Sequence, residues 1–138
     1  MADDPARHAW LLMSDLVLDN MRRKAVSDAL GMSFGRTRAL RRLARQPMSM
    51  RELADVLGID PPNATVVVDE LEAAGLVARR PHPTDRRAKV VQATRKGKTL
   101  ARRADAILGT PPAGLSELDA DDLATLRAIL ERASGAGT

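Results

Sequence analysis

The residues best suited to bind a charged partner lie in the stretch PHPTDRRAKVVQATRKGK, residues 81–98. From Arg79 to Arg103 the chain has ten Lys or Arg residues and a single acidic residue, Asp85, although its formal net charge is only +4. The rest of the chain is therefore net acidic. An ordinary solvated surface mixes charges of both signs. We therefore expect this segment to contact nucleic acid, because Lys and Arg gain affinity by releasing the cations condensed on phosphates.

Catalytic and metal-binding chemistry has little support in the sequence. There is no cysteine, and the two histidines, His8 and His82, lack metal-ligand spacing. We find no nucleophile elbow and no glycine-rich phosphate loop. The expectation is no enzyme activity, no metal and no cofactor, with His82 a solvated turn residue. One Trp, one Phe and no Tyr also disfavour the stacking of single-stranded bases, so duplex is the favoured nucleic acid.

Length and composition predict one globular domain over residues 1–138. The chain is 44% hydrophobic, which is enough for a core without disulfides or metal. The N-terminal sequence MADDPARH lacks a signal-peptide pattern, and the longest strictly apolar run is AWLLM at 9–13. We therefore expect a cytoplasmic protein that does not contact membranes.

Four helices are expected before the basic segment. The first runs from Pro5 to Leu30 and is apolar on two sides. The second begins at the N-cap Ser33 and has arginines on its outer face. A short third helix begins at Ser49 and ends at Gly58, and a fourth, capped by Asp60, runs from 61 to 74. Two short helices joined by about three residues are typical of a helix-turn-helix.

The basic segment itself is predicted to form a hairpin. The runs LVARR and KVVQA are prone to form strands, and they flank the turn sequence PHPTDRRA. Thr94 and Asp119 can each cap a further helix. The predicted fold is mainly α, a winged helix-turn-helix at 33–94 with a two-stranded β-wing, flanked by N- and C-terminal helices at 5–31 and 95–133.

The flanking helices carry more apolar surface than a monomer of this size would expose. A symmetric partner is the simplest cover, so a homodimer is expected, with the flanking helices as dimerisation helices. The residues expected at that interface are Trp10, Leu11, Leu18, Leu123, Leu126 and Leu130.

The stretch DRRAKVVQATRKGKTL resembles the wing signature of MarR-type winged helix transcriptional regulators, D-x-R-x-x-x-V-x-L-T-x-x-G-x-x-L. Ala93 stands where the family usually has leucine, and this departure affects only the packing of the second wing strand. The matching residues are Asp85, Arg87, Val91, Thr94, Gly97 and Leu100. MSMRELADVLGIDPPNATVVVDELEAAGLVARR resembles the paired helices of the family, and LDADDLATLRAIL its closing dimerisation helix.

This resemblance, which runs from about residue 8 to 133, implies a homodimer that binds a pseudo-palindromic operator on double-stranded DNA. It also implies a repressor or an activator, with repression relieved by a small aromatic or anionic effector as the favoured mode. The effector site is left unassigned. In the family's pattern Arg87 enters the minor groove, Asp85 orients it through an ion pair, and Arg86 and Lys89 face phosphates.

The same resemblance places the start of the fourth helix in the major groove. Asn63 and Thr65 would then hydrogen-bond base edges, and Pro62 and Val66 would touch thymine methyls. From Asp60 to Ala78 the chain has four acidic residues and no base, so arginine cannot read guanine from this helix. The further residues expected at the DNA are Arg36, Arg38, Ser49 and Pro61.

Two alternative functions remain open. A winged helix module could use its basic segment to bind an acidic protein. A sequence-neutral DNA-binding protein is the second alternative, although the wing lacks the unstacking aromatics that such proteins insert between bases.

Overall fold

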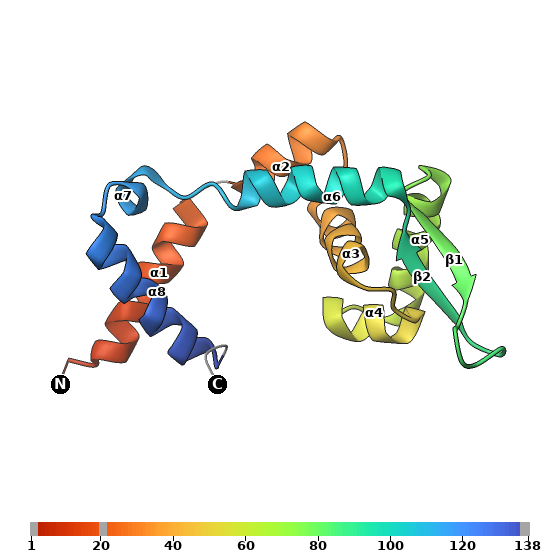
Figure 1. Ribbon diagram of the computed structural model, residues 1–138, viewed down its shortest axis with the longest axis horizontal. Coiled ribbons are helices and arrows are strands. Elements are labelled where there is room, and N and C mark those ends of the chain that lie inside the picture. The colour runs from red at the N-terminus through yellow and green to blue at the C-terminus, as the bar shows by residue number, and fades with distance from the viewer. Residues whose placement is uncertain (1–2, 20–21, 136–138) are drawn as a thin grey trace. The chain divides into compact units, whose positions relative to one another are not determined.

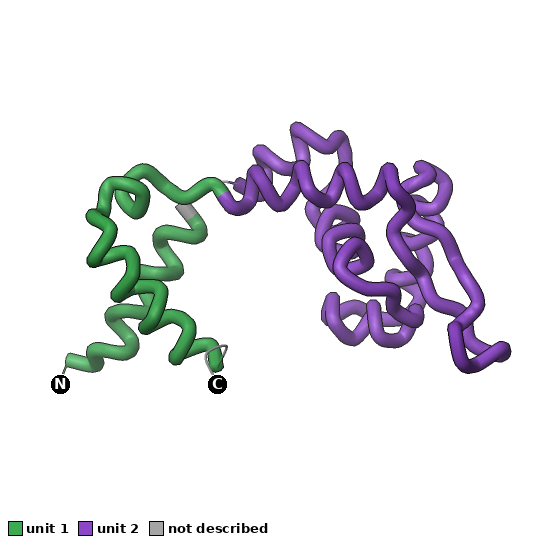
Figure 2. Tube along the Cα trace, viewed as in Figure 1, with its two compact units in different colours: residues 1–20, 110–138 green, residues 21–109 purple. Residues whose placement is uncertain are grey.

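The computed structural model describes residues 3–19 and 22–135. The chain divides into two compact units, unit 1 (residues 1–20 and 110–138) and unit 2 (residues 21–109), coloured separately in Figure 2. Each unit has its own internal packing, and each is described by itself below.

Unit 2 is a winged helix-turn-helix, labelled in Figure 1. Its elements follow in the order α2 (Arg22–Leu30), α3 (Phe34–Arg45), α4 (Met50–Leu57), α5 (Pro61–Ala73), β1 (Val77–Pro81), β2 (Lys89–Ala93) and α6 (Arg95–Leu108). Helix α3 packs against α5 and α6, and α4 packs against α5. The predicted fold class is confirmed: helices dominate, and one two-stranded antiparallel sheet forms the wing.

Short polar side chains begin the helices where the sequence predicts them. The Oγ of Ser33 accepts a hydrogen bond from the amide of Arg36, and the Oγ of Ser49 accepts one from Glu52. The carboxylate of Asp60 accepts one from the amide of Asn63 at 2.9 Å. These bonds satisfy amides that have no partner inside the helix. Between α4 and α5, Gly58 adopts φ = 69°, a left-handed conformation that glycine tolerates better than other residues.

The two strands of the wing are in register from Val77 opposite Ala93 to Pro81 opposite Lys89. Met48 adds an isolated bridge to β2, with the amide of Val91 donating to the carbonyl of Met48 at 2.7 Å. Ala93 is buried, so the alanine that replaces the family's leucine still faces the core. The buried cluster beneath the wing contains Ala39, Leu40, Leu43, Met48, Leu53, Leu57, Val68, Leu71, Leu76, Val77, Val91, Ala93 and Ala101.

The motif residues Thr94 and Gly97 join α6 to the wing. The Thr94 hydroxyl donates to the carbonyl of Gly75 at 2.7 Å and accepts from the amide of Gly97 at 3.1 Å. The Thr94 amide donates to the carbonyl of Leu76 at 2.9 Å. A Cβ on Gly97 would lie only 2.0 Å from that same carbonyl oxygen. This part of the signature is therefore structural, because it lets α6 approach the backbone before β1.

Unit 1 contains α1 (Pro5–Asp19), the short α7 (Ala113–Ser116) and α8 (Ala120–Ser134). None of the described residues in these three helices is buried. Of the residues expected at the dimer interface, Trp10 and Leu18 have 64% and 72% of their surface exposed, and Leu126 is half-buried. The other large apolar side chains exposed here are Leu11, Leu12, Leu16, Val17, Leu118, Leu123, Ile129 and Leu130.

Two features differ from the sequence-based expectations. The single helix expected at 5–30 is present as α1 and α2, which belong to different units; residues 20–21 lie outside the described part of the chain. The apolar residues of the two segments therefore have different environments. Val26 of α2 is fully buried in the core of unit 2, whereas the large apolar side chains of α1 are largely exposed. The helix α7 was not expected, since Pro111 and Pro112 suggest only a break.

Candidate nucleic-acid interface

A compact turn at residues 82–88 connects the two strands of the wing. The amide of His82 donates to the carbonyl of Ala88 at 3.0 Å, and the amide of Ala88 donates to the carbonyl of Asp85 at 3.1 Å. The Asp85 carboxylate accepts the amide of Arg87 at 3.0 Å. These bonds give the turn a defined shape although its residues are mostly exposed. A defined turn reduces the conformational entropy that DNA contact would otherwise remove from the tip.

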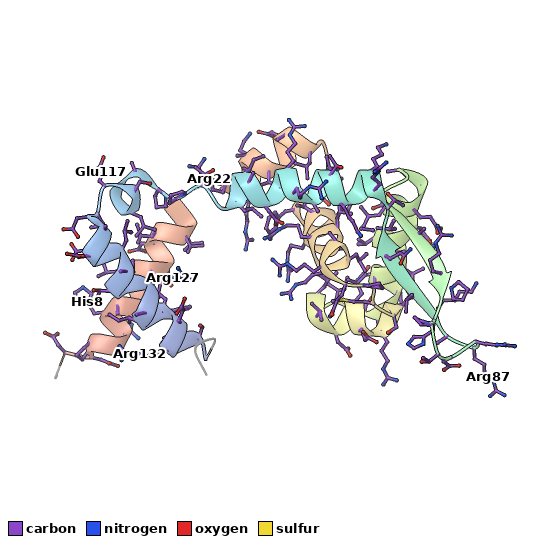
Figure 3. The ribbon with its side chains drawn as sticks, in the orientation of Figure 1. His8, Arg22, Arg87, Glu117, Arg127 and Arg132 are labelled. Atoms are coloured by element: carbon purple, nitrogen blue, oxygen red, sulfur yellow. The ribbon has the colours of Figure 1, made fainter. Side chains whose placement is uncertain are left out.

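The cations of this turn project into solvent. Figure 3 shows Arg87 at the outer end of the hairpin, pointing away from the strands. Within the described residues, the side chains of Arg86, Arg87 and Lys89 form no hydrogen bond or ion pair. The structure therefore places three unpaired positive charges, from two neighbouring turn residues and the first residue of β2, at one end of unit 2.

The expected ion pair between Asp85 and Arg87 is not formed. Asp85 instead binds the backbone amide of Arg87, so its carboxylate shapes the turn and leaves the guanidinium unrestrained. A carboxylate two residues before an amide commonly makes such a turn, because the side chain reaches the backbone more easily than the far end of an arginine. The prediction that Asp85 orients Arg87 through an ion pair is wrong for this free state.

The first turns of α5 present the short side chains expected at the base edges. Pro61, Pro62, Asn63 and Thr65 are all exposed, and Val66 has 54% of its surface exposed. Asn63 donates its side-chain amide to Asp60 at 3.2 Å, and Thr65 donates its hydroxyl to the carbonyl of Pro61 at 3.1 Å. Both polar groups therefore have partners within the helix, but the carbonyl oxygen of Asn63 and the acceptor sites of Thr65 remain open.

Arginines from neighbouring elements pair with the acidic residues of α5. Arg79 of β1 binds Asp69 at 2.7 Å and Glu72 at 2.6 Å, and Arg36 of α3 binds Glu70. The hydrogen bond to Asp69, with further attraction from Glu72, raises the pKa of Arg79 although partial burial opposes this. The acidic side of α5 is thus largely neutralised from within unit 2, which reduces its repulsion of phosphates.

These pairs change the roles of two cations. Arg79 was counted among the cations available to nucleic acid, and Arg36 was expected at the DNA; the structure ties both to α5. Arg41 is likewise paired, with Asp105 of α6. Arg38 is exposed and has no such partner among the described residues. Ser49 is half-buried and caps α4, so its hydroxyl already accepts the amide of Glu52.

Sequence reasoning missed three structural roles. Besides Arg79, Lys96 donates to the carbonyl of Ala74 at 3.2 Å, at the end of α5. The ring nitrogen Nδ1 of His82 accepts amides of the wing turn. The role of Lys96 could have been predicted once the end of α5 was known, because cations commonly bind the free carbonyls at a helix C-terminus. Nothing in the local pattern identifies the partners of Arg79, because they lie seven and ten residues away on another element.

The described part of the chain contains neither a candidate metal site nor a candidate membrane span. Among residues 3–19 and 22–135, no three His, Asp or Glu side chains are grouped so as to hold a metal ion. No helix in these ranges is long and apolar enough to cross a membrane.

Comparison with known proteins agrees with this geometry. A family model described as MarR family matches residues 30–88, which span α3, the helix-turn-helix, β1 and the wing turn. Among solved structures, RV2887 of Mycobacterium tuberculosis, a MarR family protein in complex with salicylic acid, is 26% identical with a TM-score of 0.66, covering 95% of this chain and 96% of that one.

Two further structures have the same fold over nearly all of this chain. CouR of Rhodococcus jostii RHA1, bound to p-coumaroyl-CoA, is 26% identical with a TM-score of 0.64, covering 93% of this chain and 90% of that one. RV1404 of Mycobacterium tuberculosis is 24% identical with a TM-score of 0.73, covering 97% of each chain. Residues 30–88 therefore match the model of the MarR family, and the fold is that of these winged helix structures.

Proposed function

We propose that this chain is a homodimeric transcriptional regulator that binds a pseudo-palindromic operator on double-stranded DNA and acts as a repressor relieved by a small molecule. The observation that carries the proposal is the contrast between its two kinds of cation. Arg36 and Arg79 neutralise the acidic residues of α5, whereas Arg86, Arg87 and Lys89 at the wing have no partner in the described chain. Unpaired arginines on a preformed turn suit phosphates and the minor groove.

The exposed start of α5 supports sequence-specific contact. With no Lys or Arg between 60 and 78, this helix reads bases through short side chains. Val66 and Pro62 offer methyl and methylene groups to thymine methyls, and the open carbonyl oxygen of Asn63 can accept from an exocyclic amine. Most of the electrostatic attraction then comes from the wing and from the unpaired arginines of α3.

Unit 1 supports the homodimer. Its helices α1 and α8 expose large apolar side chains and contain no buried residue among those described. Burying one leucine stabilises an assembly by about 1.5 to 3 kcal/mol. A second copy of the chain covers this surface with the symmetry that two operator half-sites require. The small-molecule effector is proposed by analogy, because RV2887 and CouR have structures with salicylic acid and p-coumaroyl-CoA bound.

The decisive experiment selects bound sites from random duplexes and then compares two wing variants. We expect Arg87→Ala to weaken binding by about 1 to 3 kcal/mol per half-site and to remove a preference for A·T-rich flanks. Lys89→Ala should weaken binding to all sequences similarly and lower the salt slope by about one ion per half-site. Both residues are exposed and unpaired, so neither change should alter folding.

Three outcomes would contradict the proposal. If Arg87→Ala discriminates between A·T-rich and G·C-rich flanks as well as the parent does, the wing does not read the minor groove. If no site is enriched and competitor DNA removes all binding, the protein is a sequence-neutral binder. If duplex DNA is not bound at all, the wing serves a protein contact instead.

A further inference from the structure

His82 lies at the point where the wing turn leaves β1. Its Nδ1 lies 3.1 Å from the amide nitrogen of Thr84 and 3.1 Å from that of Asp85. The hydroxyl of Thr84 lies 3.2 Å from the same nitrogen. A backbone amide can only donate, so Nδ1 must accept in this arrangement. Nδ1 therefore carries no hydrogen in this geometry.

Pro83, which follows His82, explains why the His82 side chain meets these amides. Pro83 has no amide hydrogen, so Thr84 and Asp85 supply the first donors after His82. A residue that precedes proline is also held in an extended conformation. The imidazole of a half-buried residue is thus directed at the amides of the turn.

The hydrogen bonds of the turn form a connected path from His82 to Arg87. The Asp85 amide donates to His82, and the Asp85 carboxylate accepts the amide of Arg87. The amide of His82 also closes the turn on Ala88. The backbone position of Arg87 is therefore held by Asp85, and Asp85 is held by His82.

We propose that His82 is a positioning residue for the wing arginine, and that a proton on its Nδ1 releases the turn. A protonated imidazole donates from both nitrogens, so it would face the amides of Thr84 and Asp85 with no acceptor. This proposal rests on the proposed DNA binding only for its effect on affinity. The change in the turn itself occurs without DNA.

Besides Arg79, which is bound to α5, the charged groups on the wing turn and on the strands that it joins are one carboxylate, Asp85, and four cations. The four cations are Arg80 on β1, Arg86 and Arg87 on the turn and Lys89 on β2. The only side chains of the protein that ordinarily change charge between about pH 5.5 and about pH 8 are its two histidines, His82 and His8.

His82→Asn is the conservative variant. The Oδ1 of asparagine is attached to Cγ, as Nδ1 is in histidine, and it accepts the amides of following residues in turns without titrating. His82→Ala removes the acceptor altogether. His8→Asn is the matched control, because His8 lies in unit 1 and is exposed.

Operator affinity is measured for the four proteins at about pH 8 and about pH 5.5, in about 0.2 M salt to screen direct attraction between an imidazolium and phosphate. At the higher pH we expect His82→Asn to match the parent and His82→Ala to bind about three- to tenfold more weakly per half-site, the effect of losing one or two hydrogen bonds. On acidification the parent and His8→Asn should weaken by a similar factor, and His82→Asn should not. Equal pH dependence in the parent and His82→Asn would overturn the proposal. Tighter operator binding by the parent at the lower pH would also overturn it, because that result indicates a direct contact between the imidazolium and a phosphate.

The turn is also measured without DNA. In the parent, amide resonances and hydrogen exchange of Thr84 and Asp85 should follow the titration of the His82 ring, with faster exchange when the ring is protonated. In His82→Asn they should stay constant. If the amide resonances and exchange rates of Thr84 and Asp85 stay constant with pH in the parent, the inference is overturned even if DNA is bound. If DNA is bound at neither pH, the proposed function is overturned, and this measurement still decides the role of His82.

Discussion

Gly97→Ala would insert a methyl group at the junction of α6 with the residue before β1. The new Cβ would lie 2.0 Å from the carbonyl oxygen of Leu76, 3.0 Å from its carbonyl carbon and 3.2 Å from Cδ1 of Leu40. Two of these atoms belong to the backbone, so no rotamer change can relieve the contact. The start of α6 must therefore move by about 1 Å or more to restore an ordinary contact distance.

The free energy of this change follows from three contributions. Forcing a methyl group into a packed region destabilises by about 1 to 3 kcal/mol. The movement also weakens the hydrogen bond from the Thr94 amide to Leu76, which contributes about 1 kcal/mol. The higher helix propensity of alanine offsets about 1 kcal/mol. We expect a net loss of about 1 to 3 kcal/mol in the free energy of unfolding.

The assay is urea unfolding at fixed protein concentration, because the stability of the proposed dimer would depend on concentration. Gly35→Ala is the control, since Gly35 is an exposed helical residue with no atom within 4 Å of its added Cβ. The same chemical change there should stabilise the protein by up to about 1 kcal/mol. If Gly97→Ala is as stable as the parent, the close approach of α6 to Leu76 is not a constraint on this fold.

Three other changes have distinct expected results. Arg79→Ala should lower the free energy of unfolding by about 1 kcal/mol at low salt and less in 1 M salt, because its ion pairs are partly exposed; an equal loss at both salt concentrations would contradict this. Val66→Ser should leave stability unchanged and make operator binding insensitive to replacing the contacted thymine by deoxyuridine, which lacks the methyl group, whereas the parent loses affinity. Leu130→Asp should convert a dimer to a 14.9 kDa monomer in sedimentation, and a parent that already sediments as a monomer would refute the dimer.

The order and type of the elements in unit 2 were predictable because their signals are local. A cap such as Ser33, Asp60 or Thr94 acts on an amide three residues away, and the structure confirms each of these caps. The wing strands were also predictable, since short apolar runs flank a turn with two prolines. The first helix was less predictable, because apolar spacing cannot tell one helix facing two bodies from two helices in different units.

The charge of the basic segment is visible in the sequence, but the partner of each cation is not. The ten Lys or Arg residues between 79 and 103 indicate a polyanionic partner. The sequence does not distinguish those that form ion pairs within the chain from those that do not. Only the folded chain separates Arg79, which is bound to α5, from Arg87, whose side chain has no partner among the described residues. The distinction depends on which helix packs beside which strand.

The winged helix architecture, its helix starts and the position of its basic segment can be read from the sequence, since each signal lies within a few residues. Tertiary structure alone decided that the acidic residues of α5 are neutralised, that Asp85 holds a backbone amide rather than the guanidinium of Arg87, and that His82 accepts the amides of the turn. Those interactions require atoms from separate elements, or a specific turn geometry, to lie within about 3 Å of one another. Residue order does not specify such distances, because they depend on which elements pack together and on the conformation that the turn adopts.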